Sequence, residues 1–374
     1  MMSNENQLLT GRQLEGGASS SLFIDGKRFL NFGGCNYLAL TNRAELRDAA
    51  LNALENGCLF ARYLHIDYGG NVASFDRVER EAAVFFGTQS AIYLPSGYHL
   101  GFASLTGLEP YLDVVVLDEQ AHWCLSQAAV LSGAQVKYFT HCDPDALEKI
   151  LEDLADHERP LIATDGAFAT SGRMPPLDCY SELAERFDGQ LLVDESHSAG
   201  VIGNTGRGAL QHFGIRERAY AATTLSKAFC GHGAVFTGPK EMTERARQTP
   251  AVRGSNAGSP ISAEVSAASL RLVRENPELC ADVRSKTSYL RKGLRSIGLE
   301  VIESPSSIVS FCWGGFEEMR AIQTSLFEDG IYVMHSNYIA AGPGGTIRLT
   351  VFADHTLEDL DNLIQKIRVL VATE

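Results

Sequence analysis

The sequence predicts an α/β protein in which a large, mostly parallel sheet carries helices on both faces and is accompanied by a smaller α+β domain. Short apolar runs alternate with longer segments of helical period, as is typical of a sheet with covering helices. The chain has 374 residues, which is more than one hydrophobic core usually supports. After Gly238-Pro239 the alternation gives way to a long helical stretch, so the second domain is expected there.

Six apolar or β-branched runs are predicted as strands of the large sheet. Each run is short and is bounded by polar or glycine-containing segments. The six runs are Ala91–Leu94, Val114–Asp118, Leu161–Asp165, Gln190–Asp194, Ala221–Leu225 and Gly233–Thr237.

Helices are expected between these strands, for example over Pro144–Ala155 and Leu177–Phe187. In the first of these, Asp143 is placed to cap the N-terminus and Pro144 occupies the first helical position. One apolar stripe runs along this helix and predicts packing on the sheet. The stripe consists of Leu147, Ile150, Leu151 and Leu154.

The smaller domain is expected to combine a helical stretch, Ser262–Ile297, with new strands and a final helix, Leu357–Val371. The strands are expected near Glu300–Ile302, Ile308–Trp313 and Thr346–Phe352. The N-terminal segment Leu8–Arg43 is expected to form an arm outside the large sheet. We therefore predict an arm, a large domain and a small C-terminal domain over residues 1–45, 46–240 and 241–374.

Charge and apolar content exclude several kinds of partner. Lys and Arg number 32 and Asp and Glu 46, so the formal net charge is −14. Without a run of Lys or Arg, such a chain is a poor match for nucleic acid or for an anionic membrane surface. The segment Met1–Gly11 is polar and has no signal-peptide core, and the apolar stretches are too short to span a bilayer. We expect a soluble protein without nucleic-acid or membrane partners.

The eight cysteines are widely separated, with no CxxC pair and no histidine at metal-ligand spacing. This usage predicts reduced thiols in a cytoplasmic protein and no metal site. They are Cys35, Cys58, Cys124, Cys142, Cys179, Cys230, Cys280 and Cys312.

Reactive side chains follow the predicted strands, and ligands of open α/β sheets bind beyond the carboxyl ends of strands. Asp194 ends one strand, and His197 follows three residues later. Such a pair can hold a heterocycle, because the carboxylate stabilises a protonated ring nitrogen and the imidazole reaches a neighbouring oxygen. A capping aspartate and a packing histidine would give the same pattern.

The next strand leads to Lys227, which lies among small and apolar residues. Desolvation there would favour a free amine that can form a Schiff base with an aldehyde. Thr224 is placed to donate its hydroxyl to a phosphate. A loop lysine is usually only solvated, and its place after the Asp194 and His197 pair is what singles it out.

Two further strand ends carry candidate ligands. Ser96, Gly97 and Tyr98 precede a candidate helix, where free backbone N–H groups and the helix dipole favour a phosphate. His122 follows another strand and would project into the same crevice, where it could stack on a planar cofactor. Each feature by itself is weak, because strand-helix turns and solvated histidines are common.

Together these residues resemble the pyridoxal-phosphate enzymes of fold type I and, within them, the α-oxoamine synthases, which are acyl-CoA-dependent condensing enzymes. Seven blocks follow one another in the order and at the separations of that family, over nearly the whole chain. The blocks are Asn36-Tyr37-Leu38-Ala39-Leu40, Ser96-Gly97-Tyr98, Asp118 with His122, Thr164-Asp165-Gly166 with Pro175-Pro176-Leu177, Asp194-Glu195-Ser196-His197-Ser198-Ala199-Gly200, Thr224-Leu225-Ser226-Lys227 and Ile347-Arg348-Leu349-Thr350. The Asp194–His197 block and the Ala61–Gly70 stretch look closest to the branch that makes quorum-signalling aminoketones.

The resemblance implies pyridoxal 5′-phosphate as the cofactor and assigns roles to single residues. Lys227 would hold the cofactor as an aldimine and later move the Cα proton. Asp194 would keep the pyridine nitrogen protonated, His197 would bind the phenolic oxygen, and His122 would cover the ring face. The expected phosphate ligands are Ser96, Gly97, Tyr98 and Thr224, with Ser255 reaching the site of the other subunit.

The reaction implied is a condensation between an amino acid, or a related amine, and an acyl thioester such as acyl-CoA. A quinonoid carbanion would attack the thioester, and decarboxylation is expected to accompany the reaction. The resemblance also implies a homodimer whose active sites are shared. Two alternatives stay open: an aminotransferase or lyase on the same scaffold, and a non-catalytic protein that kept the cofactor site.

Recognition of a substrate carboxylate departs from the family pattern. Many oxoamine synthases have an arginine shortly before the Arg-Leu-Thr strand, where this sequence has His335-Ser336-Asn337. Neither His nor Ser reproduces the bidentate bonding of arginine. Arg348 is the alternative carboxylate ligand, although strand packing explains it equally well. Asn36 and His335 are the other candidate substrate residues.

Overall fold

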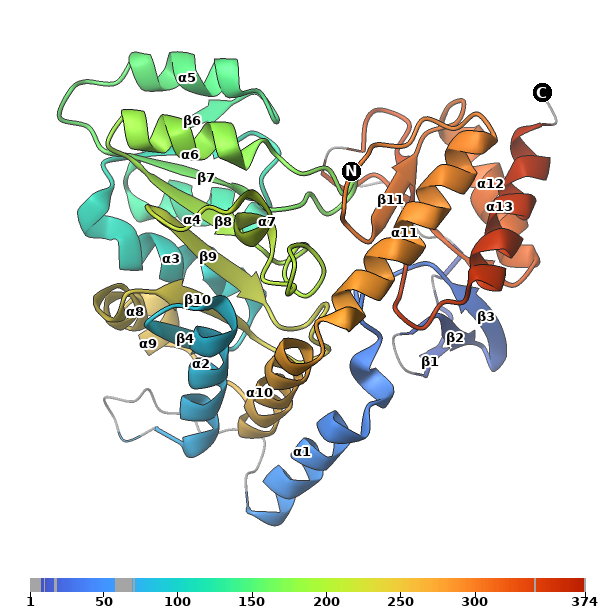
Figure 1. The fold of residues 1–374 in the computed structure, drawn as a ribbon, viewed down its shortest axis with the longest axis horizontal. Coiled ribbons are helices and arrows are strands. Elements are labelled where there is room, and N and C mark those ends of the chain that lie inside the picture. Colours follow the sequence, from blue (N-terminus) through green and yellow to red (C-terminus); the bar gives the residue numbers. More distant parts are fainter. Residues whose placement is uncertain are drawn as a thin grey trace.

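The structure, a computed structural model, describes residues 8–9, 11–16, 19–57, 69, 71–339 and 341–372. The described chain contains a seven-stranded sheet, a four-stranded sheet and a three-stranded sheet. The seven-stranded sheet and its helices form one half of the molecule, and the two smaller sheets lie in the other half (Figure 1). The predicted α/β architecture is confirmed.

The large sheet has the strand order β4-β10-β9-β8-β7-β5-β6. Its strands are β4 Ser90–Leu94, β5 Val114–Asp118, β6 Gln135–Phe139, β7 Pro160–Asp165, β8 Gln190–Asp194, β9 Ala219–Thr224 and β10 Ala234–Gly238. Neighbours from β6 to β9 pair in parallel, and β10 is antiparallel to both β9 and β4. The six predicted strands are all present. The edge strand β6 was not predicted, because its sequence mixes polar and apolar residues, only the last of which is buried, and lacks an apolar run.

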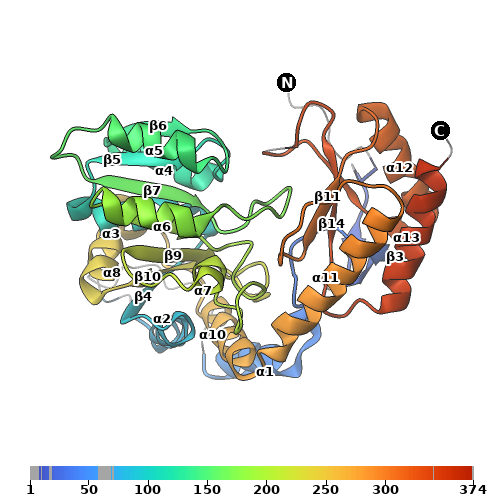
Figure 2. The same cartoon turned by 45° about the horizontal axis from the view of Figure 1, so that its top comes forward.

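Helices cover both faces of this sheet, as Figure 2 shows. Val115 and Leu117 of β5 pack in a core with α3, α4 and α8, whereas Val114 and Val116 pack with α5, α6 and α7. The alternation follows from the two-residue period of a strand, and burial on both faces explains the continuous apolar run. These helices are α3 Leu100–Leu108, α4 Trp123–Ser132, α5 Pro144–Glu152, α6 Leu177–Arg186, α7 Ala209–Phe213 and α8 Lys240–Arg247.

The start and the cap of α5 are confirmed, although the helix ends at Glu152 and not at Ala155 as predicted. The Asp143 carboxylate accepts hydrogen bonds from the backbone N–H groups of Asp145 and Ala146, and Pro144 is the first helical residue.

The remaining helices of this part of the chain lie around the sheet and between the two halves. They are α1 Ala44–Glu55, α2 Ala73–Phe86, α9 Pro250–Arg253 and α10 Pro260–Glu275, together with the short 3-10 turns η1 Leu40–Asn42, η3 Gly97–His99 and η4 Glu109–Tyr111.

The other half of the molecule contains both smaller sheets. The three-stranded sheet has the order β11-β14-β13 and the four-stranded sheet the order β1-β2-β3-β12. Its elements are β1 Leu14–Glu15, β2 Ser21–Ile24, β3 Lys27–Asn31, α11 Glu278–Ser296, β11 Ile308–Phe311, α12 Phe316–Glu328, β12 Ile331–Tyr332, β13 Met334–Ser336, β14 Thr346–Thr350 and α13 Leu357–Val371. Since β3 pairs in parallel with β12, the N-terminal strands lie beside the C-terminal third of the chain. The domain limits at residues 45 and 240 stay a prediction.

Two expectations for this half were wrong. The helical stretch expected over Ser262–Ile297 is two helices, α10 and α11, because Pro277 precedes α11 and cannot continue a helix. Glu300–Ile302 is not a strand. The Val301 carbonyl, which would have bonded a neighbouring strand, instead accepts hydrogen bonds from the guanidinium of Arg295.

No helix in the described part of the chain is both long and apolar enough to cross a lipid bilayer.

Candidate active site

The carboxyl ends of adjacent parallel strands bring the predicted reactive groups together. The backbone N–H of His122, after β5, donates to Oδ2 of Asp165 at the end of β7 over 2.8 Å. The thiol of Cys124 in α4 lies 3.6 Å from Oδ2 of Asp194 at the end of β8. Lys227, after β9, is near enough to influence the pKa of His122. The site therefore lies beyond the strand ends, where an open α/β sheet binds its ligands.

Lys227 lies in the tight connection between β9 and β10. The turn is held by backbone bonds from Leu225 N to Gly233 O and from Cys230 N to Lys227 O. The Lys227 side chain is half-buried, and its Nζ lies 2.7 Å from Nε2 of His197. The predicted pair of lysine and histidine is thus in direct contact.

His197 is a buried residue, 5% exposed, with a partner on each ring nitrogen. Its Nδ1 lies 2.5 Å from the hydroxyl of Tyr37. Burial, and to a lesser degree the charge of Lys227, lowers the pKa of His197 well below its usual value. The imidazole is therefore neutral, with one donor and one acceptor nitrogen.

Asp194 ends β8 with its carboxylate buried, 3% exposed. Oδ1 accepts the backbone N–H of Ser196 over 2.9 Å, and Oδ2 receives the Cys124 thiol. Burial and the nearby Asp194 carboxylate raise the pKa of Cys124 well above the usual thiol value, so this neighbour stays uncharged. A weak thiol donor on Oδ2 leaves that oxygen free to take a stronger donor, such as a protonated ring nitrogen.

The predicted phosphate ligands converge at the other end of the site. Ser96 caps the turn η3 by accepting the N–H of Tyr98, and Gly97 faces Thr224. A Cβ on Gly97 would lie 3.2 Å from the Thr224 side chain, so glycine keeps this cradle open. The Thr224 hydroxyl is 2.7 Å from that of Ser226. Hydroxyls and a helix-like N-terminus are the groups that bind phosphate.

His122 caps α4, with Nδ1 accepting the N–H of Cys124. Burial lowers the pKa of His122, so its ring is a neutral plane. The ring of Tyr338, from the other half of the molecule, lies 6.3 Å away between centroids. This position agrees with a ring-covering role.

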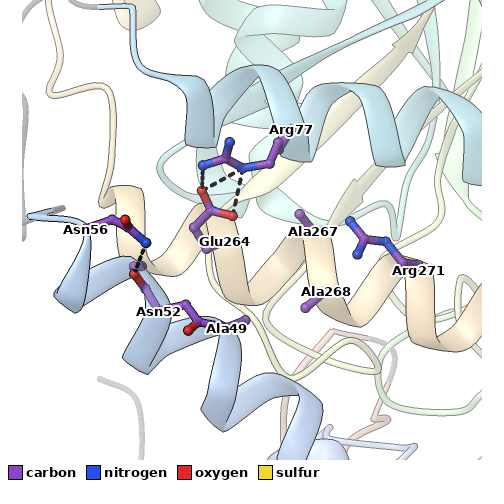
Figure 3. A pocket seen from close by; sticks show the side chains of 9 residues that line it. Ala49, Asn52, Asn56, Arg77, Glu264, Ala267, Ala268 and Arg271 are labelled. Carbon is purple, nitrogen blue, oxygen red and sulfur yellow. Dashed lines mark hydrogen bonds and ion pairs between the residues drawn. The ribbon is translucent and has the colours of Figure 1, made fainter.

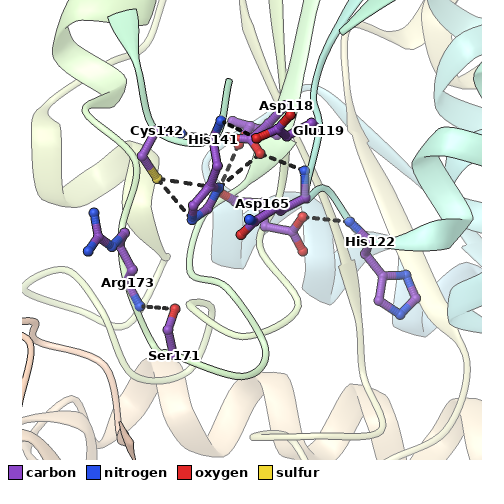
Figure 4. A network of polar contacts seen from close by, with 10 residues as sticks. Asp118, Glu119, His122, His141, Cys142, Asp165, Ser171 and Arg173 are labelled. Carbon is purple, nitrogen blue, oxygen red and sulfur yellow. Dashed lines mark hydrogen bonds and ion pairs between the residues drawn. The ribbon is translucent and has the colours of Figure 1, made fainter. Parts of the chain in front are cut away.

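Figure 4 shows a buried carboxyl group that the prediction did not assign to the site, Asp165, beside the Asp118 and His141 pair. Burial, and then the nearby charge of Asp194, raises the pKa of Asp165 well above the usual carboxyl value. Its environment therefore disfavours the charged form, although the group accepts the His122 N–H. In the sequence, Asp165 could have been recognised because it is the last residue of a buried strand, as Asp194 is.

The candidate substrate residues are divided between two places. Arg348 of β14 reaches Cys35, 3.6 Å from NH2 to Sγ, and its charge affects the pKa of His197. Asn36 donates to Cys230 Sγ over 3.4 Å. His335 of β13 bonds instead to the Gly344 carbonyl over 3.0 Å and is buried.

The structure gives little information on two further predicted features, Ser255 and the stretch 61–70. The Ser255 hydroxyl donates to backbone carbonyls of its own segment, and its predicted reach to a second subunit stays a prediction. The stretch 61–70, on which the aminoketone-synthase likeness partly depends, lies outside the described residues apart from Gly69.

A separate cavity lies where α1, α2 and α10 meet (Figure 3). Of its charged residues, Arg77 and Glu264 pair with each other and Arg271 pairs with Glu81, and the Asn56 amide donates to the Asn52 backbone carbonyl. None of the predicted site residues lines this cavity.

The residues at the strand ends fit pyridoxal phosphate. A half-buried amine lies beside a neutral imidazole, a buried carboxylate has an oxygen available for a ring nitrogen, and a glycine cradle adjoins a threonine hydroxyl. This fold and this site define a pyridoxal-phosphate-dependent transferase of fold type I. Residues 27–367 match the family Aminotransferase class I and II, and the chain belongs to that family.

Relatives narrow the class further. An 8-amino-7-oxononanoate synthase from Thermosipho melanesiensis is 31% identical over 360 residues, covering 95% of this chain and 91% of that protein. The structure of a serine palmitoyltransferase from S. paucimobilis with a bound PLP–myriocin adduct has a TM-score of 0.89 at 23% identity, covering 97% of this chain and 92% of that chain. An 8-amino-7-oxononanoate synthase from Francisella tularensis has a TM-score of 0.77 at 22% identity, covering 92% and 98%.

These similarities confirm the predicted enzyme class, the α-oxoamine synthase family and the pyridoxal-phosphate cofactor. The aminoketone-synthase branch stays a prediction.

Proposed function

We propose that this protein is an acyltransferase that condenses an amino acid, or a closely related amine, with an acyl thioester such as acyl-CoA, with loss of the amino acid carboxylate. The observation that carries the proposal is the contact of Lys227 with His197 beside the buried Asp194, in a chain related to 8-amino-7-oxononanoate synthase and serine palmitoyltransferase.

Pyridoxal phosphate, when bound, supplies an aldehyde that combines with amines and a ring that accepts the electrons of a bond broken at Cα. Lys227 provides the amine that holds the cofactor and, once freed, the base that takes and returns the Cα proton. Asp194 balances positive charge on the ring nitrogen. His197 donates to the ring oxygen, and Ser96, Gly97, Tyr98 and Thr224 hold the phosphate.

We propose Arg348 as the group that orients the substrate carboxylate. Its Nε and NH1 atoms donate to the carbonyls of Ala169 and Gly34, over 2.7 and 3.1 Å, which fixes the plane of the guanidinium. NH2 faces the Cys35 thiol, a weak acceptor that a carboxylate can replace. His335 is held by Gly344, which is why Arg348 is the better candidate.

Thiol release tests the proposed reaction. Purified enzyme is mixed with acyl-CoA and each common amino acid, S-adenosylmethionine and simple amines, and free CoA thiol is measured. We expect thiol release that depends on the amine and is accompanied by carbon dioxide. Keto-acid formation without thiol release would establish an aminotransferase instead.

We also propose a homodimer with shared active sites in the cytoplasm. Exposed apolar side chains extend from the site along α4 to β6 and suit a second copy of the chain; they are Tyr98, Trp123, Val130, Leu131 and Tyr138. The seven described cysteines are all free thiols, which agrees with a reducing compartment. Cell fractionation tests the location, and the dimer is tested below.

A further inference from the structure

Tyr37 lies directly behind the histidine of the active site. Its hydroxyl is buried and lies 2.5 Å from Nδ1 of His197, whose Nε2 is 2.7 Å from Nζ of Lys227. Tyr37 follows β3, 160 residues earlier in the chain than His197. The Tyr37 phenol thus contacts the His197 imidazole, which in turn contacts the Lys227 amine. The phenol itself is not expected to touch the cofactor.

Tyr37 and His197 are both uncharged. Burial, and then the nearby Cys35, raises the pKa of Tyr37 well above its usual value, so the hydroxyl keeps its hydrogen. Burial also keeps His197 neutral. A neutral imidazole has one N–H and one lone pair, and its partners decide which nitrogen carries the hydrogen.

We propose that Tyr37 is a positioning residue that fixes the tautomer of His197. Its O–H donates to Nδ1, which leaves the hydrogen of His197 on Nε2, where the ring oxygen of the bound cofactor would accept it. This inference rests on the proposed function, because His197 needs a hydrogen on Nε2 only if a cofactor oxygen accepts it. Tyr37 acts on the cofactor through His197 alone.

The surroundings offer one competing arrangement. The Cys35 thiol also neighbours Tyr37, and although burial raises the Cys35 pKa, the charges of Arg348 and Lys227 outweigh that effect and lower it overall. If Tyr37 donated to a Cys35 thiolate, it would have to accept a hydrogen from Nδ1, and Nε2 would face the cofactor oxygen with a lone pair. Two acceptors would then meet, which favours the first arrangement once the cofactor is attached to Lys227.

Removal of the hydroxyl gives a measurable consequence. In Tyr37→Phe the Nδ1 lone pair loses its donor inside the protein, and an unsatisfied buried acceptor is unfavourable. The imidazole then gains by moving its hydrogen to Nδ1, where a water can accept it. We expect the ratio of the two tautomers to change by about tenfold or more.

The test is a two-bond ¹H–¹⁵N NMR experiment on holoenzyme with ¹⁵N-labelled histidine, with His197 assigned from the spectrum of His197→Gln. The proposal expects a protonated Nε2 and an unprotonated Nδ1 in the wild type, and a shift toward protonated Nδ1 in Tyr37→Phe. A wild-type His197 that carries its hydrogen on Nδ1 overturns the proposal without any variant.

A matched control separates this role from a loss of packing. Tyr180 in α6 is also fully buried, and its hydroxyl has no hydrogen-bond partner among the described residues. We expect Tyr37→Phe, but not Tyr180→Phe, to shift the pH midpoint of the cofactor absorbance by about one unit. Equal midpoints in Tyr37→Phe and wild type would contradict the proposal. The NMR spectrum and the pH midpoint are both measured without turnover. They therefore test the role of Tyr37 separately from the acyl-transfer assay.

Discussion

At the scale of single residues, burial shifts the pKa values of several candidate active-site groups toward their uncharged forms. His197 has its pKa lowered and Tyr37 and Asp165 have theirs raised, in each case chiefly because burial disfavours the charged form. The result is a site in which Lys227 and Asp194 face neutral neighbours. Charged groups of the cofactor and the substrate therefore meet few other charges that compete with them for Lys227 and Asp194.

Lys227→Ala removes the amine that we propose holds the cofactor. We expect purified Lys227→Ala to lose the borohydride-sensitive visible absorbance and to release acyl-CoA thiol at least ~10³-fold more slowly, because both attachment and proton transfer depend on this group. Lys240→Ala is the control, since Lys240 lies on the surface in an exposed pair with Glu244. A yellow, active Lys227→Ala protein would refute the assignment.

Arg348→Lys replaces a planar guanidinium by a point charge. We expect the KM for the amino substrate to rise by about 10- to 100-fold, the range of one or two lost charged hydrogen bonds, while the KM for the acyl donor stays unchanged. Steady-state kinetics with each substrate varied in turn measures the difference. Parallel increases in both KM values would indicate a role in packing instead.

At the scale of elements, α3 and α4 approach so closely that a glycine is needed between them. A Cβ on Gly101 of α3 would lie 2.1 Å from the Cys124 carbonyl oxygen and 2.7 Å from Ala128 Cβ. His122 caps the N-terminus of α4, so the spacing of these helices also positions the side chain that we propose covers the cofactor.

Gly101→Ala is expected to lower the free energy of unfolding by about 1–3 kcal/mol, because the two helices must separate to admit the methyl group. Gly238→Ala is the control, since its Cβ would meet only an ordinary contact at 3.5 Å. Urea denaturation of both variants gives the comparison. Equal stability of the two would show that α3 and α4 separate without cost.

His355 ties the N-terminal strands to the segment after β14. Its Nδ1 accepts the N–H of Phe352, and its ring stacks on Phe32 at 4.3 Å between centroids. Burial lowers its pKa from 6.5 to about 4. A histidine with a lowered pKa in the folded state contributes stability above its unfolded pKa and loses it as pH falls toward the folded value.

We therefore expect the free energy of unfolding to fall by up to about 3 kcal/mol between pH 6.5 and 4 on account of His355. Urea denaturation across this range should show a shallower pH dependence in His355→Gln, whereas His212→Gln, at an exposed position, should follow the wild type. A slope that His355→Gln leaves unchanged would assign the acid sensitivity to other groups.

At the scale of the whole molecule, the net charge of −14 opposes the anionic cofactor and an acyl-CoA donor. We therefore expect binding to depend on local groups such as the Gly97 turn, Thr224 and Arg348. The exposed apolar residues beside the site have a separate role in the proposed dimer.

Leu131 is 72% exposed near the end of α4. We expect Leu131→Glu to shift the protein from dimer toward monomer, because a charge at an apolar interface must be desolvated. Light scattering after size-exclusion chromatography measures the mass. Leu357→Glu, which alters an exposed leucine at the start of α13, is the control. A monomeric wild type would remove the dimer proposal.

Much of the fold and the site follows from local sequence patterns. The strands of the large sheet are apolar runs because both of their faces are buried, and Asp194 and Lys227 stand out because polar residues end such runs. β6 escaped prediction because it is an edge strand with a mixed pattern. The break before α11 was missed because periodic apolar residues continue on both sides of Pro277.

The sequence by itself predicted the fold class and the cofactor, and it singled out the lysine, aspartate and histidine that we propose serve that cofactor, because their spacing along one segment places them at adjacent strand ends. Only the tertiary structure decided what lies behind them. Tyr37 meets His197, burial raises the pKa of Asp165 beside Asp194, and Arg348 contacts Cys35 whereas His335 is held by Gly344. These outcomes depend on contacts between distant segments and on burial, and neither is encoded in local spacing.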